Sequence, residues 1–517
     1  MADALRTPRV VVVGAGIGGL VSALLLAHRG LEVTLVEAAA TPGGKMRQIV
    51  VDGVAVDSGP TVFTMRWVLD QMLAEIGSSL DSLLQLSPIH VLARHAWRGS
   101  AAMLDLHADT QRSADAIAAF SSPAEARRFK QFCQQTRALY QTLEQPYIRS
   151  QRPSLLSMAQ DLGPRGLGTL MGLGPFATLW SSLGRHFHDV RLQQLFARYA
   201  TYCGSSPWAA PATLMLVAQV ELDGVWSVHG GMHAVAQALA GLAQQRGVML
   251  RYGVACSQIE TAQGRVSGVR LASGEHLAAD AVVFNGDVGA LAQGLLGAGP
   301  QQAVAPVPVA QRSLSAVTWS MHARASGFPL VRHNVFFDHD YRSEFDDIFS
   351  SRRLPRQGTV YLCAQDRDDQ GLSQAGPERM LALVNAPADG DSPAFQASEI
   401  QACEHRSLAL LRHCGLTLQA QPHQVVRSTP QDFGRLYPGT GGALYGRATH
   451  GWMSAFARPS AQSKVPGLYL AGGSAHPGPG VPMAAMSGRL AAATLMAHLD
   501  STSRSRRVVI SGGMSTP

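Results

Sequence analysis

At 517 residues, the chain is longer than the roughly 250 to 300 residues at which a single hydrophobic core stops growing, so at least two domains are expected. Only 15% of its residues are charged and 46% are hydrophobic, whereas soluble domains average about 25% charged, which indicates a folded protein with apolar surface. The formal net charge of +7 indicates an anionic partner, and the low aromatic content of 6% argues against nucleic acid and favours an anionic membrane surface.

The spacing of cysteine and histidine argues against several further classes. The six cysteines are scattered without a CxxC pair, which disfavours a zinc site, thioredoxin chemistry and a disulfide framework, and fits a reducing cytoplasm. His186 and His188 could begin a metal site, but no third ligand follows at a useful spacing, so no metal is expected. The apolar segment 10–26 is interrupted by glycines, which argues against a secretory signal.

The N-terminal residues have the pattern of a βαβ unit. The β-branched run 10–13 predicts a strand, apolar residues at helical spacing as far as Gly30 predict a helix, and 33–36 predicts a second strand. Glu37 ends that strand, where a carboxylate can bind ribose hydroxyls and disfavours the 2′-phosphate of NADP. The unit therefore indicates a dinucleotide site.

The turn of this unit reads Gly14-Ala15-Gly16-Ile17-Gly18-Gly19. Gly14 permits a tight turn, Gly16 lets the backbone approach a pyrophosphate, and Gly19 lets the helix pack close to the strand. The pyrophosphate would lie on N–H groups at the helix N-terminus, where the helix dipole favours negative charge. The alternative is a glycine loop that arose by chance and binds nothing, which the complete strand–turn–helix–strand context disfavours.

The choice between FAD and NAD depends on the residues that follow. Pro42-Gly43-Gly44-Lys45 lies just beyond Glu37 and resembles the second glycine pair of the long flavoprotein fingerprint. Asp57-Ser58-Gly59-Pro60-Thr61 follows as another turn of close backbone approach. We therefore expect FAD, with NAD as the rival.

The middle of the chain alternates between helical and mixed segments. From about 70 to 222 the pattern is mostly helical, and from 226 to 285 it returns to α/β character. Residues from about 310 to 455 mix strands with a helix, which indicates the sheet of a substrate domain. The individual segments expected are helices 124–143, 191–202, 232–246 and 393–414, strands 249–252, 281–285, 314–322, 359–364 and 379–386, and a hairpin around Gly264.

Near the C-terminus the chain repeats its opening pattern of strand, glycine turn and helix. The strand 468–471 runs into Gly472 and Gly473, and a Pro/Gly segment at 477–482 precedes a helix to Leu499. The N-terminus of this helix could face the flavin and stabilise negative charge on its reduced form. The alternative is an ordinary loop before a helix, with no role in cofactor binding.

These patterns together predict an α/β fold with a Rossmann-like FAD-binding domain and a second, α+β domain that binds substrate. We assign 1–70, 223–300 and 456–500 to the first domain, 71–222 and 301–455 to the second, and 501–517 to a disordered tail. The residues expected to bind FAD are Gly14, Gly16, Gly19, Glu37, Gly44, Lys45, Gly59, Thr61, Val254, Gly472, Gly473, Pro482 and Met483.

The uncharged stretch 166–184 is the part of the substrate domain that could meet lipid. Its length touches the threshold of about 18 to 20 residues for a membrane span. Several glycines and Pro175 weaken a spanning helix, so we favour an interfacial patch, with a buried core segment and a span as alternatives. This predicts peripheral, monotopic attachment at the cytoplasmic side of a membrane.

The glycine turn, the segment 42–45 and the C-terminal segment together resemble the phytoene-desaturase-type carotenoid desaturases, a branch of the amine-oxidase-like flavoproteins, over almost the whole chain. Within the family, the sequence looks most like the hydroxyneurosporene desaturases, which introduce the 3,4 double bond into acyclic 1-hydroxycarotenoids. The segments that carry the likeness are 57–61, Trp226 with 229–232, 332–337 leading to Tyr341 and 344–346, 313–319 with 327–330, 285–287 with 290–291, and 476–480.

The resemblance implies that flavin removes a hydride from a carbon beside a polyene while an adjacent carbon loses a proton. The cation left behind is delocalised, so a weak base is enough, and the catalytic residue stays unknown. Weak candidates for that base, or for binding a terminal hydroxyl, are His229, Arg149, Arg152 and His333. His229-Gly230-Gly231 lacks the basic residue associated with that site in phytoene desaturases.

Two other functions stay open from the residues alone. The chain could be another FAD oxidase of this fold, acting on phytoene, an amine or a porphyrinogen. It could instead be a non-catalytic lipid chaperone that shares the glycine loop. The oligomeric state stays open.

Overall fold

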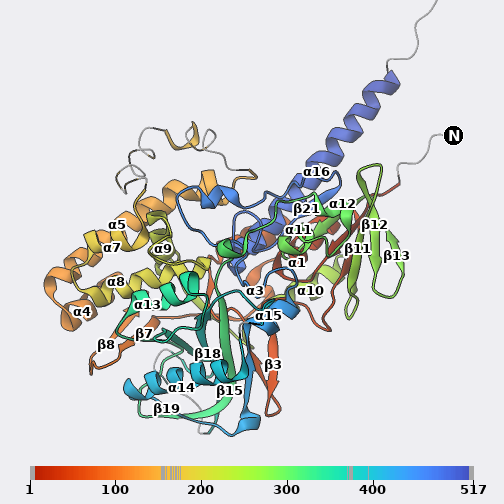
Figure 1. Ribbon diagram of the computed structural model, residues 1–517. Helices are drawn as coiled ribbons and strands as arrows, with labels where there is room; N and C mark the ends of the chain where they lie inside the picture. The colour runs from red at the N-terminus through yellow and green to blue at the C-terminus, as the bar shows by residue number, and fades with distance from the viewer. Residues whose placement is uncertain are drawn as a thin grey trace, which may run out of the picture.

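The computed structural model describes residues 6–511 apart from 153–157, 159, 164–165, 167, 169–171, 173, 175, 369–370, 372–375 and 394. The two largest sheets of the described chain have five and eight strands, and a layer of helices covers the larger one (Figure 1).

A five-stranded sheet forms the part of the molecule that contains the N-terminal strand. Every pairing in it is parallel, so the strands end at the same edge of the sheet, at Val13, Phe284 and Leu470 among others. Its order is β10 (Met249–Arg251), β2 (Glu32–Val36), β1 (Arg9–Val13), β14 (Ala281–Phe284) and β21 (Leu468–Leu470). All three stretches assigned from sequence to the FAD-binding domain contribute strands; the domain boundaries stay a prediction.

Three helices pack around this sheet. α1 (Ile17–His28) lies against both α10 (His233–Gln245) and α16 (Val481–Ser511), and their apolar faces share one core with the strands. Buried β-branched residues such as Val10 and Val12 form β1 because they fit a sheet covered on both faces. α16 continues past Leu499 to Ser511 and projects away from the body (Figure 1), whereas the assignment of 501–517 to a disordered tail stays a prediction.

Smaller elements surround the cofactor sheet. The hairpin predicted around Gly264 is confirmed by the antiparallel strands β11 (Cys256–Ala262) and β12 (Arg265–Leu271), which β13 (His276–Ala278) extends. The remaining short elements here are β3 (Gln48–Val51), β4 (Val54–Asp57), β5 (Phe63–Thr64), β6 (Leu86–Pro88), β9 (Val225–Val228), α2 (Trp67–Glu75), α3 (Leu80–Leu83), α11 (Val288–Ala292) and α12 (Ala298–Gln301).

An eight-stranded sheet forms the second region. Its order is β19 (Thr417–Gln419), β15 (Ser315–Ser326), β18 (Glu378–Ala386), β17 (Val360–Ala364), β16 (His333–Phe337), β7 (Val91–Trp97) and β8 (Met103–His107), with β20 (Val425–Ser428) paired to β15. β7 and β8 fall inside the stretch expected to be mostly helical. β7 is buried on both faces, so its sequence lacks the alternation that would have marked a strand.

Helices cover the two faces of this sheet differently. α14 (Ala397–His413) contacts β16 and β17, and its buried residues share a core with one face of the sheet. The other face meets a layer of helices whose centre is an aromatic cluster of Phe129, Phe132, Phe187 and Phe196. The elements of that layer are α4 (Thr110–Phe120), α5 (Pro123–Leu143), η1 (Glu144–Ile148), α7 (Leu179–His186), α8 (Val190–Ala197), η2 (Arg198–Cys203), η3 (Ala212–Met215) and α9 (Leu216–Leu222).

Further short elements complete the described chain. They are η4 (Val309–Gln311), α13 (Tyr341–Phe345), η5 (Asp346–Ser350), η6 (Pro422–Gln424), α15 (Pro430–Leu436) and η7 (Ser454–Ala457). The helix expected over 191–202 is α-helical as far as Ala197 and continues as a 3-10 helix from Arg198, where the first three residues are buried.

We expect Gly19→Ala to lower the free energy of unfolding by about 1–3 kcal/mol, because the added methyl would force α1 away from β1. A Cβ at Gly19 would lie 2.0 Å from the carbonyl oxygen of Gly14. Thermal melting of both proteins measures the effect. Gly241→Ala is the control, since nothing lies within 4 Å of its added Cβ, and equal melting temperatures for the two variants would contradict the packing argument.

Candidate cofactor and substrate site

The glycine turn at the N-terminus of α1 leaves its backbone bare. Gly16 precedes the helix and offers no side-chain cap, so the first N–H groups of α1 have no side-chain acceptor from that residue. Gly14 has a φ of +101°, a backbone conformation that residues with a side chain rarely adopt. It lines a cavity together with Gly16 and Gly18. Such a turn can accept an anionic diphosphate on backbone N–H groups.

Glu37 lies at the end of β2, beside this turn. Its carboxylate accepts hydrogen bonds from the backbone N–H of Ala15 at 2.6 Å and of Ala39 at 2.8 Å. Glu37 and Val254 both line the cavity, and the backbone N–H of Val254 donates to the carbonyl of Glu37. These bonds hold the carboxylate in one orientation, where it can accept from ribose hydroxyls.

The segments containing the three predicted glycine motifs are in direct contact. A Cβ added to Gly18 would lie 2.9 Å from the backbone nitrogen of Gly472, and one added to Gly44 would lie 3.3 Å from the Cα of Gly16. Asn285 lies between them, since its side-chain amide donates to the carbonyl of Gly14 at 3.2 Å. The chain ends expected to share one cofactor cleft therefore do so.

Twelve of the thirteen residues predicted to bind FAD line one cavity, and Gly19 does not. Gly19 packs on the carbonyl of Gly14 instead, in the helix-packing role expected of it. The residues on the cavity wall are Gly14, Gly16, Glu37, Gly44, Lys45, Gly59, Thr61, Val254, Gly472, Gly473, Pro482 and Met483.

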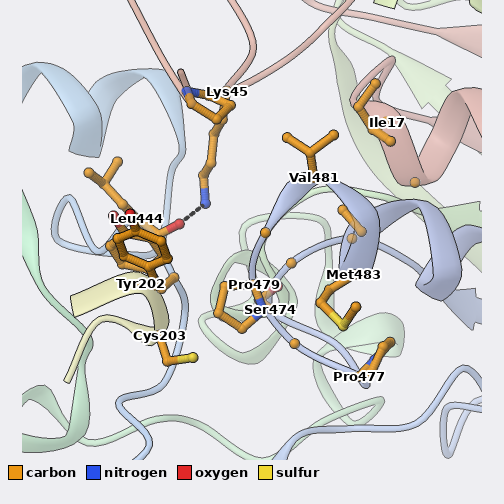
Figure 2. A pocket seen from close by; sticks show the side chains of 18 of the residues that line it. Ile17, Lys45, Tyr202, Cys203, Leu444, Ser474, Pro477, Pro479, Val481 and Met483 are labelled. Atoms are coloured by element: carbon orange, nitrogen blue, oxygen red, sulfur yellow. Dashed lines mark hydrogen bonds between the residues drawn. The ribbon is translucent and has the colours of Figure 1, made fainter. Parts of the chain in front are cut away.

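Lys45 and Arg458 face the same cavity near the glycine segments, and neither has a carboxylate partner within ion-pair distance among the described residues. The Lys45 ammonium donates to the carbonyl of Leu444 at 2.6 Å (Figure 2), and burial lowers its pKa. Arg458 donates to three backbone carbonyls, including that of Gly473 at 3.2 Å, and burial lowers its pKa as well. A buried cation without a counter-ion is costly, so an anionic cofactor fits this cavity.

The N-terminus of α16 forms the wall opposite Lys45. Figure 2 shows Val481 and Met483 at the start of the helix, with Pro479 and Ser474 on the loop before it. All four line the cavity. The positive end of the helix dipole would favour negative charge on a reduced flavin placed here.

Beyond the glycine segments the same cavity continues between the large sheet and the helical layer. Its volume is about 1120 Å³, above the roughly 300 to 1,000 Å³ of ordinary ligand pockets. Its far walls are mainly apolar and come from α5, η1, α9 and the large sheet. They include Leu143, Ile148, Met158, Leu162, Leu214, Leu216, Val217, Val220, Leu381 and Leu383. A long apolar molecule would fill this space.

None of the four weak catalytic candidates lies on the described wall of this cavity. His229 uses its backbone N–H to bond the carbonyl of Gln85. Arg149 is held by an ion pair with Glu144 at 2.7 Å and stacks on Trp67.

The other two candidates lie close to the cavity without forming its wall. Arg152 lines a second cavity of about 500 Å³. The Nδ1 of His333 lies 2.8 Å from the hydroxyl of Tyr361, and burial lowers the pKa of His333 to about 3, so the ring is neutral. His333 therefore approaches the cavity only through Tyr361, which does line it.

Several polar residues on the cavity wall were missed by sequence reasoning. They are Arg198, Tyr202, Glu221, Tyr361, Asn385 and Arg458. One sequence feature could have indicated them. Arg198, Tyr199 and Tyr202 interrupt the apolar helical pattern 191–202, and polar residues in such a pattern are expected to be buried with partners.

The stretch 166–184 divides between core and surface in its described part. Leu179 and Leu183 on α7 are fully buried, whereas Phe176 is 77% exposed and packs edge-on against Trp452, which is 46% exposed. Ala177 lines the main cavity, so this exposed pair lies beside it. Residues 167, 169–171, 173 and 175 lie outside the described residues. No helix in the described chain has the length and apolar character needed to cross a membrane.

This fold and site define a flavin-dependent oxidoreductase. Residues 17–496 match the family described as flavin containing amine oxidoreductase, and the chain belongs to that family. It is 69% identical over 516 residues to a hydroxyneurosporene desaturase of Rubrivivax gelatinosus, covering 100% of this chain and 98% of that one. It is 46% identical over 499 residues to a hydroxyneurosporene desaturase of Cereibacter sphaeroides, covering 96% of this chain and 99% of that one.

Solved structures show the same fold at low identity. Cyclohexylamine oxidase from Brevibacterium oxydans superposes with a TM-score of 0.56 at 16% identity, covering 96% of this chain and 100% of that one. The amine-oxidase-like fold, the FAD cofactor and the resemblance to hydroxyneurosporene desaturases predicted from sequence are therefore confirmed.

We expect Gly16→Val to lower FAD affinity by about tenfold or more, equal to about 1.4 kcal/mol, because the branched side chain fills the space of the diphosphate. A Cβ there would already lie 2.8 Å from the side-chain nitrogen of Asn285. The ratio of flavin to protein after purification, followed by FAD titration, measures the loss. Gly241→Val is the control, and a fully yellow Gly16→Val protein would contradict the assignment.

Proposed function

We propose that the protein is an FAD-dependent carotenoid desaturase that forms a double bond at C3–C4 of an acyclic, 1-hydroxylated carotenoid. The observation that carries this proposal is one continuous cavity that runs from the glycine segments into mainly apolar walls. The names of the two hydroxyneurosporene desaturases that share 69% and 46% of their aligned residues with this chain supply the substrate class.

The side chains and backbone N–H groups described above would hold the cofactor at the carboxyl edge of the parallel sheet. Glu37 would bind the ribose, the turn at Gly14 and Gly16 the diphosphate, and Lys45 and the N-terminus of α16 the flavin end. Bound FAD supplies the hydride acceptor that the protein itself lacks. The chain's own contribution is to orient the polyene against that end and to exclude water.

Proton loss makes a small demand on the protein. The cation formed beside a polyene is delocalised, so its proton is acidic and a weak base near the cavity is sufficient. The four candidates named from sequence lie off the described wall, which is consistent with a reaction that needs no strong base. The mainly apolar lining around Val217 and Leu383 keeps competing water away from the cation.

The membrane contact belongs to the same proposal. Phe176, Trp452 and Met453 are exposed apolar side chains, and Trp452 lines the cavity. A substrate that dissolves only in lipid needs an entrance at the bilayer surface, and aromatic side chains are favoured there. Together with the net charge of +7, these residues support peripheral attachment to an anionic membrane at its cytoplasmic side.

The desaturation is tested by mixing the FAD-loaded protein with a 1-hydroxylated acyclic carotenoid in the absence of oxygen. We expect the flavin absorbance to bleach and the polyene spectrum to shift to the red, because a new double bond lengthens the conjugated system. Amines and porphyrinogens serve as comparison substrates. Bleaching by one of these instead of the carotenoid would favour another oxidase, and protein that binds no flavin would favour a lipid chaperone.

The attachment is tested with Phe176→Ser combined with Trp452→Ser. We expect binding to phosphatidylglycerol vesicles to fall about tenfold or more, because two apolar side chains no longer enter the interface. Co-sedimentation measures binding, and flavin content checks the fold. Val50→Ser combined with Met249→Ser is the matched control, since these side chains are 69% and 61% exposed but lie off the cavity wall. An equal loss for both pairs would count against a localised contact.

A further inference from the structure

A polar cluster interrupts the apolar wall of the cavity. It consists of Arg198, Tyr202 and Glu221, all of which line the cavity, and we name it the Arg198 cluster. Arg198 Nη1–H donates to the Tyr202 hydroxyl at 2.8 Å, and that hydroxyl donates to the Glu221 carboxylate at 2.6 Å. A guanidinium keeps its charge at any ordinary pH, and the Glu221 carboxylate offsets that charge through Tyr202, so the cluster is a polar group set within a mainly apolar wall.

The Arg198 cluster has hydrogen-bond donor and acceptor positions that no described residue occupies. The bond to Tyr202 is the one side-chain hydrogen bond that Arg198 makes among the described residues, and its buried Nε has no partner there. Burial raises the pKa of Tyr202, so its phenol is neutral and its oxygen retains a free acceptor position. An alcohol donates one hydrogen bond and accepts others, so the cluster can satisfy both needs at once.

Two other hydroxyls on the same wall, those of Tyr361 and Thr359, already have partners. The Tyr361 hydroxyl lies 2.6 Å from the hydroxyl of Thr61 and 2.8 Å from Nδ1 of His333. The Thr359 hydroxyl donates to the Glu344 carboxylate at 2.7 Å. Each of these hydroxyls has its single proton within hydrogen-bond distance of an acceptor, whereas Arg198 keeps an N–H donor without a partner among the described residues.

The cluster lies at the cofactor end of the cavity. The chain leaves Tyr202 for Gly204, where an added Cβ would lie 2.7 Å from the Tyr445 ring. Arg458 donates to the carbonyls of both Tyr445 and Gly473, which connects this segment to the C-terminal glycine turn. Figure 2 shows Tyr202 among the side chains that line the pocket, together with Lys45, Leu444 and Ser474.

Resting on the proposed function, we propose that the Arg198 cluster binds the hydroxyl of a 1-hydroxylated polyene and so selects hydroxylated over unhydroxylated substrates. Arg198 donates a hydrogen bond to the substrate oxygen, and the Tyr202 oxygen accepts a hydrogen bond from the substrate's hydroxyl. A single methylene separates the carbinol carbon from C3, so any group that binds the hydroxyl must lie close to the reacting bond. The place of the cluster beside the cofactor end meets that requirement and sets which bond faces the flavin.

The test compares kcat/KM for 1-hydroxyneurosporene and for neurosporene in the wild-type holoenzyme and in Tyr202→Phe. We expect the variant to lose at least about tenfold of the wild-type preference for the hydroxylated substrate, as expected when a polar site loses its partner. The hydroxylated substrate should show both a raised KM and a lowered kcat, because binding and alignment depend on the same bond. Flavin content and melting temperature check that the variant is folded.

Tyr199→Phe is the matched control. The Tyr199 hydroxyl donates to the other oxygen of the Glu221 carboxylate at 2.6 Å, but Tyr199 does not line the cavity. We expect its preference to stay within about twofold of wild type, since it leaves the cavity face of the cluster in place. An equal loss of preference in both variants, or in neither, would overturn the assignment.

Two further variants keep the inference open to refutation. If Tyr202→Phe fails to retain FAD, Arg198→Lys is tested instead, and the same loss of preference for the hydroxylated substrate is expected. Lysine keeps the charge and loses the planar set of N–H donors. Thr318 also lines the cavity, and its hydroxyl has no partner among the described residues. Loss of preference in Thr318→Val with retention in Tyr202→Phe would move the hydroxyl site to Thr318 and overturn the proposal.

The two proposals fail in different ways. A flavin-loaded wild-type protein that desaturates neither polyene would refute the proposed function, and the inference with it. A wild-type protein that desaturates both with equal kcat/KM would refute the inference alone.

Discussion

The close approach of three glycine segments at one edge of a parallel sheet is the constraint on which the site depends. Gly18 leaves no space for a Cβ against Gly472, and Gly44 lies against Gly16. Side chains at these positions would push apart β1 and β21, which flank β14 in the sheet. Because the contact joins residues from both ends of the chain, the cofactor cleft requires both ends to be in place.

The cofactor half of this arrangement was predictable because each of its motifs is local. A strand, a glycine turn and an amphipathic helix leave a pattern within a few dozen residues, and Glu37 follows at the expected place. β7 and β8 were missed for a physical reason: β7 is covered on both faces, so it has no polar alternation to distinguish it from a buried helix. The sequence analysis ended the last helix at Leu499, because the residues after it are rich in serine and arginine, a composition typical of disorder.

The polar groups of the cavity could not be predicted in the same way. Tyr202 and Glu221 lie on different elements, and nothing in their spacing indicates that their side chains meet at 2.6 Å. Lys45 was identified from its place in a glycine motif, but its burial without a counter-ion depends on Arg458 and Leu444, which lie far away in sequence. Local motifs thus identify the cofactor, whereas contacts between distant segments determine the substrate.

The position of the Arg198 cluster also restricts how a long substrate can lie. If one end of the polyene is held beside the cofactor, the rest of the molecule must extend through the apolar part of the cavity toward Ala177 and Trp452. That route ends at exposed Phe176, next to the surface that would meet lipid. A hydroxyl site placed near the membrane entrance would leave the hydroxyl in reach of water and the reacting bond far from the flavin. Polar recognition at the inner end and apolar contact at the outer end therefore follow from a single orientation of the substrate.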